Sequence, residues 1–201
     1  MDKASAKPRR LIYLASNNAH KAQELTAMAR GMFDVRLAKE LDPHVQWDET
    51  GSTCLENARI KAKVVRSLTN AAVLADDSGL EVDALGGAPG VYSSRYAGRD
   101  GDDAANNAKL LRELASTPEK DRKARFVCVL YFIDEQGREQ SFEGSCPGSI
   151  LMAARGEGGF GYDPLFLVDG HGKSMAELSP DEKNAVSHRR RAFDIFLKAV
   201  T

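Results

Sequence analysis

The chain has 201 residues, of which 42% are hydrophobic and 28% are charged, and its formal net charge is −1 at pH 7. This composition is typical of one globular domain with a substantial core, and the balanced charge argues against a nucleic-acid-binding protein. The amino terminus has no apolar stretch typical of a signal peptide, and the longest apolar run, 126–133, is too short to span a bilayer. The three cysteines have no metal-binding spacing, and because their number is odd and no secretory signal is present, we expect a reduced, cytoplasmic protein. From the charge balance and the short apolar runs we expect contact with neither nucleic acid nor membrane.

Hydrophobic periodicity alternates between strand-like and helix-like segments, after ten polar residues that we expect to be disordered. The first half predicts a strand over 11–15, a helix over 19–32, a strand over 33–37, a helix over 53–68 and a strand from 71 that ends at 76–77. The second half predicts a loop-rich stretch over 84–101 and a helix over 103–115. A strand over 125–133, a hairpin turn at 135–137 and a strand over 138–144 follow. A glycine-rich loop over 156–164 then leads to one final helix from 180. This order predicts an α/β fold with a mixed sheet, in a single domain over 11–201.

Two adjacent acids, Asp76 and Asp77, follow the buried run 71–75 and precede Ser78 and Gly79, which favour a turn. Carboxylates at the carboxyl end of a strand in an α/β fold lie where ligands usually bind. Neighbouring acids in one site repel each other, and a divalent cation relieves that repulsion. The segment therefore predicts a Mg²⁺ site beside a phosphate-bearing substrate, with a solvated acidic turn as the alternative.

The turn between the first strand and the first helix consists of Ser16, Asn17, Asn18, Ala19, His20 and Lys21. Backbone N–H groups at a helix amino terminus bind anions, and Lys21 adds a positive charge. Asparagines tolerate the left-handed conformation that such a turn often needs. The turn is a candidate phosphate site, with plain helix capping as the alternative and with His20 expected at the surface.

A second group of polar residues lies at the start of the helix over 53–68. Thr53 and Glu56 form a possible capping box, which is the interpretation we favour for Glu56. Lys61 shares a helix face with Asn57 and would meet a phosphate, or else is a solvated lysine. Glu49 would join the metal site if its loop folds toward Asp77.

The loop over 156–164 contains Phe160, Gly161, Tyr162 and Asp163. Glycines let the backbone approach a ligand closely, and an aromatic ring in such a loop can stack on a nucleobase. Asp163 would hydrogen-bond a base or sugar, or orient a basic group. The alternative is a tight turn with Phe160 as part of the core.

The final helix, opened by a possible capping box of Ser179 and Glu182, carries three basic residues that point to ligand binding: Lys183, His188 and Arg189. Its apolar face, continued backwards from 193–200, reaches Arg189, which therefore points inward. A buried arginine needs a partner, and an anionic or polar ligand would supply one. The alternative for His188 is a structural histidine with satisfied hydrogen bonds.

Taken together, five runs in this order resemble the inosine/xanthosine triphosphate pyrophosphatase family: LASNNAHKAQEL, ETGSTCLENARIKA, ADDSGLEVDALGGAPGVYSSRYAG, GEGGFGYDPLF and AELSPDEKNAVSHRRRAF. The resemblance covers roughly residues 11–198. It implies an elongated mixed sheet flanked by helices, with two lobes around a nucleotide-binding cleft, and usually a homodimer. It also implies Mg²⁺-dependent hydrolysis of ITP, dITP and XTP to the nucleoside monophosphate and pyrophosphate.

By the same resemblance, Asp77 is expected to be the catalytic acid and a metal ligand, with Glu49 as a second metal ligand. Lys21 and Lys61 are expected to act on the phosphates within a binding turn that spans Ser16 to Lys21, and Ser78 to contact the substrate. The nucleoside is expected to meet Phe160, Gly161, Tyr162, Asp163, Lys183, His188 and Arg189. The first turn differs from the usual Thr-Gly-Asn of the family, because Asn17 replaces a glycine where φ is expected to be positive.

Two other functions are compatible with these residues. One is a related pyrophosphatase that acts on modified pyrimidine nucleotides, which a substrate panel separates. The other is a nucleotide-binding regulatory module without turnover, against which the intact pair Asp76 and Asp77 argues. The sequence does not decide which of these two acids is the base.

Overall fold

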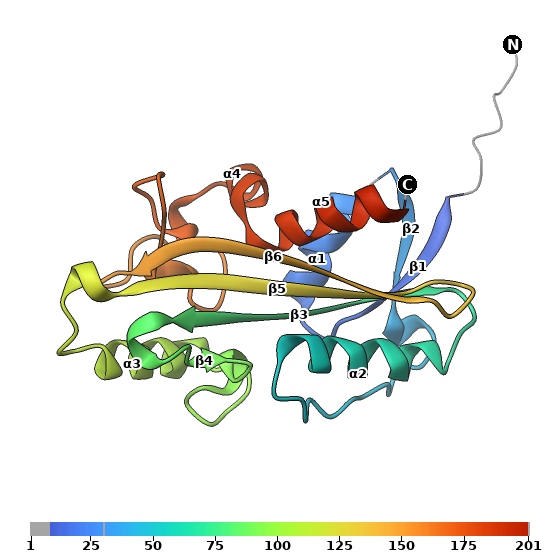
Figure 1. The fold of residues 1–201 in the computed structure, drawn as a ribbon, viewed down its shortest axis with the longest axis horizontal. Coiled ribbons are helices and arrows are strands. Elements are labelled where there is room, and N and C mark those ends of the chain that lie inside the picture. Colours follow the sequence, from blue (N-terminus) through green and yellow to red (C-terminus); the bar gives the residue numbers. More distant parts are fainter. Residues whose placement is uncertain (1–8, 30, 201) are drawn as a thin grey trace, which may run out of the picture.

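The computed structural model describes residues 9–29 and 31–200, which form one seven-stranded mixed sheet flanked by helices (Figure 1). The strands are β1 (Arg10–Ala15), β2 (Phe33–Leu37), β3 (Ala72–Val82), β4 (Pro89–Gly90), β5 (Lys123–Ile133), β6 (Glu139–Ile150) and β7 (Phe166–Val168). The α-helices are α1 (Ala19–Ala29), α2 (Cys54–Arg66), α3 (Asp103–Glu113), α4 (Pro180–Val186) and α5 (His188–Val200). The predicted α/β class with a mixed sheet is confirmed.

The strand order is β2-β1-β3-β5-β6-β7, with β4 paired to β3 beyond the end of β1. Strand β1 is parallel to both β2 and β3, whereas β3, β5, β6 and β7 form antiparallel ladders. The pairing of β1 with β3 covers Ile12–Ala15 and stops at Ala75, but β3 continues beside β5 as far as Val82. A long strand therefore runs from the parallel half of the sheet into the antiparallel half.

Helices cover both faces of this sheet (Figure 1). Side chains of α1 and α5 form one core with alternate residues of β1 and β3, including Leu14 and Leu74. Side chains of α2 form a second core on the opposite face with the intervening residues, including Tyr13 and Val73. A third cluster joins α3 to the far end of β3 and to β5–β7, so apolar packing continues along the elongated molecule.

Several predicted boundaries differ from the structure. The apolar run ends at Ala75, but β3 does not, because its ladder with β5 continues through Asp76 and Asp77 to Val82. The expected turn at Ser78 and Gly79 is therefore wrong. In the expected disordered segment 1–10, residues 1–8 lie outside the described residues, and Arg10 begins β1 and pairs with Glu135.

The expected final helix is divided in two. Ser187 has an extended ψ of 152°, which separates α4 from α5 and changes their direction. The cap at Ser179 is confirmed as a full capping box with Glu182. At α2, Thr53 accepts from the Glu56 N–H as expected, but the Glu56 carboxylate accepts from Ser52 rather than completing the box.

The short strand β7 was not predicted from the sequence. None of the described helices is long and apolar enough to cross a bilayer.

Candidate active site

The two adjacent acids face opposite sides of the sheet. Successive side chains of a strand alternate between its faces, so Asp76 shares a side with Leu74 and Asp77 shares a side with Val73. Both acids are held by the ladder of β3 with β5, opposite Leu130 and Val129. Each acid has a close basic partner of its own, Lys21 for Asp76 and Lys61 for Asp77, yet both acids line one cavity.

Asp76 lies on the α1/α5 side, and its side chain is fully buried. Its carboxylate accepts from Lys21 Nζ at 2.9 Å, from Arg189 Nε at 3.0 Å and from the Ser78 hydroxyl at 3.1 Å. The Cys128 thiol, at 3.1 Å, adds a fourth donor. Burial alone would raise the pKa of Asp76, but Arg189 and Lys21 outweigh it and hold that pKa well below its usual range. Asp76 is thus a stably ionised anchor for two cations.

Asp77 lies on the α2 side, where Lys61 Nζ approaches its Oδ1 at 2.6 Å. The same ammonium is 2.9 Å from Glu49 Oε1, so it bridges the two carboxylates. Burial raises the pKa of Asp77 above its ordinary value despite the opposing attraction of Lys61. Burial also favours the neutral form of Lys61, yet Asp77 and Glu49 together keep the pKa of Lys61 above its usual value. Asp77 therefore accepts a proton more readily than Asp76.

The turn before α1 is built as a helix amino terminus. Asn18 caps the helix, because its side-chain oxygen accepts from the Lys21 N–H at 3.1 Å. The Ser16 hydroxyl accepts from the Asn18 N–H at 3.3 Å and tightens the turn. Among the described residues only glycines have positive φ, so the expectation of a left-handed Asn17 is wrong. The turn forms without the family's glycine.

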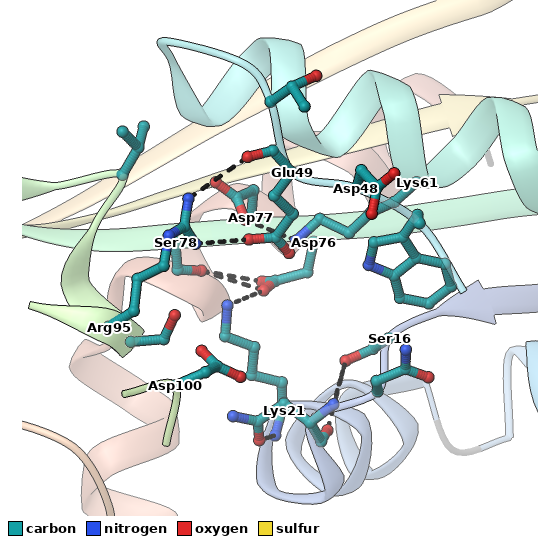
Figure 2. A pocket seen from close by; sticks show the side chains of 16 residues that line it. Ser16, Lys21, Asp48, Glu49, Lys61, Asp76, Asp77, Ser78, Arg95 and Asp100 are labelled. Atoms are coloured by element: carbon teal, nitrogen blue, oxygen red, sulfur yellow. Dashed lines mark hydrogen bonds and ion pairs between the residues drawn. The ribbon is translucent and has the colours of Figure 1, made fainter. Parts of the chain in front are cut away.

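A cavity of about 710 Å³ opens where β1 ends beside β3. Figure 2 shows Lys21 extending toward Asp76, and Glu49 placed between Lys61 and Arg95. The predicted residues that line this cavity are Ser16, Asn17, Asn18, Lys21, Glu49, Lys61, Asp77 and Ser78, and Asp76 lines it with them. The structure therefore brings the predicted phosphate and metal residues into one cleft.

The carboxylates of Glu49 and Asp77 already converge on a single cation, the ammonium of Lys61. Within the described part of the chain, no group of three or more His, Cys, Asp or Glu side chains is arranged to hold a metal. Two carboxylates with phosphate oxygens and water match the way Mg²⁺ is usually bound at phosphate-transfer sites. The donor set fits a divalent metal that is shared with a phosphate ligand.

Several of the remaining predicted residues form a second cluster, whereas Tyr162 packs in the third apolar core and donates to the Ser93 carbonyl. Lys183 Nζ lies 2.7 Å from Asp163 and 2.9 Å from Glu24, and sits 4.5 Å above the ring of Phe160. Asp163 also accepts the Phe160 N–H at 2.9 Å. Burial raises the pKa of Asp163 against the effect of Lys183. These side chains and His20 do not line the open cavity.

Arg189 joins the two clusters, and its side chain is only 1% exposed, as its position on the helix face predicted. Its three nitrogen atoms contact Asp76, Glu24 and the Ser78 hydroxyl. The neighbouring His188 is buried against Phe126, with ring centroids 5.0 Å apart, and its Nδ1 is unpaired. Burial, with Arg189 beside it, holds the pKa of His188 well below its usual range, so the ring is neutral. Whether either residue contacts a base stays a prediction.

Sequence reasoning missed several residues of this site: the cavity is also lined by Trp47, Asp48, Thr50, Val91, Ser94, Arg95 and Asp100. Glu24, one turn after His20 in α1, is the shared partner of Lys183 and Arg189. Arg95 reaches across the cavity and places its guanidinium 3.4 Å from Glu49 Oε2. No local pattern singles out Glu24, because its partners lie in α4 and α5, and the role of Arg95 depends on how a loop far along the chain folds back.

Comparisons with known proteins agree with this geometry. A sequence profile described as Ham1 family matches residues 12–199. The chain is 48% identical over 191 residues to a dITP/XTP pyrophosphatase of Exiguobacterium sibiricum, covering 94% of this chain and 96% of that protein. It is 50% identical over 183 residues to a dITP/XTP pyrophosphatase of Pseudomonas syringae pv. tomato, covering 90% and 92%. The solved Ham1 protein of Staphylococcus aureus superposes with a TM-score of 0.85 at 42% identity, covering 96% of this chain and all of that one.

Proposed function

Because the chain belongs to the Ham1 family, we propose that it hydrolyses the non-canonical purine nucleotides ITP, dITP and XTP to the nucleoside monophosphate and pyrophosphate. The observation that carries the proposal is the bridging of Asp77 and Glu49 by Lys61 in the cleft that also receives the capped amino terminus of α1. Cations, a helix amino terminus and paired carboxylates in one cleft are the parts that phosphate-anhydride hydrolysis needs.

The triphosphate binds across the turn Ser16–Lys21. Free N–H groups at the start of α1 favour a negative charge there, and Asn18 and Ser16 hold the turn in position. Lys21 is held in place by Asp76, so its ammonium group is positioned before the phosphates arrive, whereas Lys61 is held beside them by Asp77 and Glu49. Pre-positioned cations stabilise the charge that develops in the transition state without reorganisation.

Glu49 and Asp77 would hold the divalent metal, which we propose is Mg²⁺. When bound, the metal neutralises phosphate charge and draws electron density from the phosphorus that is attacked. For Asp77 to bind the metal, the ammonium of Lys61 must turn away from Asp77 and toward the phosphates. In the same way, the guanidinium of Arg95 must leave Glu49 and contact phosphate oxygens.

Asp77 is the better candidate for the base that accepts a proton from the attacking water. Both carboxylate oxygens of Asp76 are already engaged, by Lys21 and Arg189 among other donors. Asp77 accepts from Lys61, whose ammonium we expect to turn toward the phosphates, so Asp77 is the freer of the two acids to accept a proton. Asp76 instead positions Lys21 and Arg189.

The purine stacks on Phe160, with Lys183 and Asp163 beside the nucleoside. His188 and Arg189 discriminate the 6-oxygen of hypoxanthine and xanthine from the 6-amino group of adenine, which would leave donors unpaired. Arg189 must exchange one of its present acceptors to do so. For this reason we assign direct base contact first to Phe160 and Lys183.

Pyrophosphate release from ITP, XTP, GTP and ATP with Mg²⁺ tests the function. Release from ITP and XTP, weak release from GTP and ATP, and loss of all four in Asp77→Asn are expected. Equal rates with all purines would refute the base-recognition roles. No release from any nucleotide would refute hydrolysis and favour a binding module.

We also propose a homodimer, which sedimentation equilibrium tests by the mass of the particle against the 21.9 kDa of one chain.

A further inference from the structure

The ring of Phe160, on which the purine is proposed to stack, is already covered by another ring. The imidazole of His20 lies 5.1 Å from the Phe160 centroid, with the two planes only 13° apart. This is parallel stacking, the arrangement that a nucleobase makes with an aromatic side chain. The pair explains why Phe160 does not line the open cavity although Lys21, the residue after His20, does.

The Phe160 side of this pair is fixed to the body of the protein. Asp163 accepts the Phe160 N–H at 2.9 Å. The backbone of Gly161 is held at both ends by α3, because Asp103 accepts the Gly161 N–H at 2.7 Å and Asn107 donates to the Gly161 carbonyl at 2.9 Å. Asp103 and Asn107 are one helical turn apart, so one face of α3 makes both hydrogen bonds to the loop.

The His20 side is free to move. His20 is exposed at the second position of α1. Within the described part of the chain its imidazole makes the ring contact with Phe160 and no hydrogen bond or ion pair. Rotation about its two side-chain bonds therefore costs little beyond the stacking itself.

We propose that His20 is the movable outer wall of the purine subsite and that Phe160 is its fixed inner wall. A purine inserts between the two rings, which requires them to separate to roughly 7–8 Å, two aromatic contact distances. Because His20 precedes Lys21 in the phosphate-binding turn, one segment of chain then contacts both ends of the nucleotide. This inference rests on the proposed function and adds a base contact to it.

The substitutions His20→Ala and His20→Phe test the inference. Loss of one stacking ring is expected to raise the KM for ITP by about fivefold to 100-fold in His20→Ala, with kcat changed far less. His20→Phe keeps a flat ring and is expected to remain within about threefold of the wild-type KM. Alanine favours helix, so the variant is expected to fold.

Two inhibitors separate base stacking from phosphate binding. The inhibition constant of IMP, which carries the base, is expected to rise in His20→Ala in parallel with KM. That of inorganic triphosphate, which has no base, is expected to stay the same. The matched control is His171→Ala, which removes an exposed imidazole from the loop after β7 and is expected to change neither constant.

An unchanged or lower KM in His20→Ala would overturn the inference, as would an equal loss of IMP and triphosphate binding. A wild-type protein that releases no pyrophosphate from ITP would instead refute the proposed function. The two failures are therefore distinguishable in one set of assays.

Discussion

Replacing Asp76 with asparagine is expected to destabilise the fold more than the same change at Asp77, although we propose that Asp77 carries the chemistry. The Asp76 side chain is fully buried and neutralises Lys21 and Arg189. Removing its charge leaves the buried Arg189 guanidinium with Glu24 as its remaining carboxylate. Breaking a buried pair in this way costs about 3–5 kcal/mol. For a chain of this length, that lowers Tm by about 6–20 °C.

At Asp77 the same change leaves Lys61 with Glu49, 2.9 Å away. The raised pKa of Asp77 also means that the fold stabilises its ionised form poorly, so a neutral side chain is better tolerated. We expect a loss of about 1.5–3 kcal/mol, the range for a hydrogen bond to a charged group. Turnover is expected to fall by at least about 100-fold, since a general base contributes that much or more.

Urea unfolding followed by the fluorescence of the single tryptophan, Trp47, gives both free energies of unfolding, and pyrophosphate release gives the activities. The reasoning fails if Asp77→Asn is the less stable variant, or if it retains near-normal turnover. A fully folded Asp76→Asn with wild-type stability would refute the anchoring role of that carboxylate.

The pH dependence of stability gives an independent check. The folded pKa of Asp76 lies below the ordinary value of 3.8, so the unfolded chain binds the proton first as pH falls. The stability from Asp76 is therefore complete above its unfolded pKa and is lost as pH falls through the folded one. Asp77 has the opposite sign, because its folded pKa is raised and stability falls as pH rises from 3.8 toward that pKa. In Asp76→Asn we expect the free energy of unfolding to fall less steeply as pH is lowered. An unchanged acid-side slope would contradict the role of Asp76 as an ionised anchor.

Three further predictions concern packing, capping and thiol chemistry. Gly144→Ala would place a Cβ 2.3 Å from the Ala192 N and the His188 carbonyl oxygen. We expect the variant to push α5 away from β6, to lose about 1–3 kcal/mol of unfolding free energy in a urea melt and to raise the KM for ITP. An unaltered melt would show that α5 shifts freely. Ser179→Ala removes the cap of α4 and is expected to cost about 0.5–2 kcal/mol, whereas Ser179→Asp should restore most of it in the same melt. The Cys54 thiol is buried, and its pKa is raised by burial and by the neighbouring Asp77 carboxylate. A thiol reagent at pH 8 should therefore label Cys54 slowly in the folded protein and rapidly in urea. Fast labelling of Cys54 in the native protein would contradict this.

Local signals were sufficient for some features of the site. The cap at Ser179 depends on residues three apart, and the structure confirms it. The inward direction of Arg189 followed from continuing an apolar helix face, and the side chain is buried. Such features were predictable because the interacting groups, or the pattern that orients them, lie within one helix.

Features that depend on distant partners were not predictable. The strand was expected to stop at Asp76 because a charge ends an apolar run, but burial of that charge is stabilised by Arg189, 113 residues away. No local pattern shows that Glu24 joins Lys183 to Arg189, or that Arg95 meets Glu49. The adjacent acids were expected in one site, and both do line one cavity, although they lie on opposite faces of the strand.

The alternating charges of Asp76, Arg189, Glu24, Lys183 and Asp163 also have a consequence for the newly made protein. The three acids precede both of the cations that they share, since α4 and α5 follow them in the chain. Until these two helices dock, the acids lack their basic partners, and the proposed walls of the purine subsite lack their support. We therefore expect a nascent chain to remain catalytically silent until α4 and α5 have left the ribosome and docked.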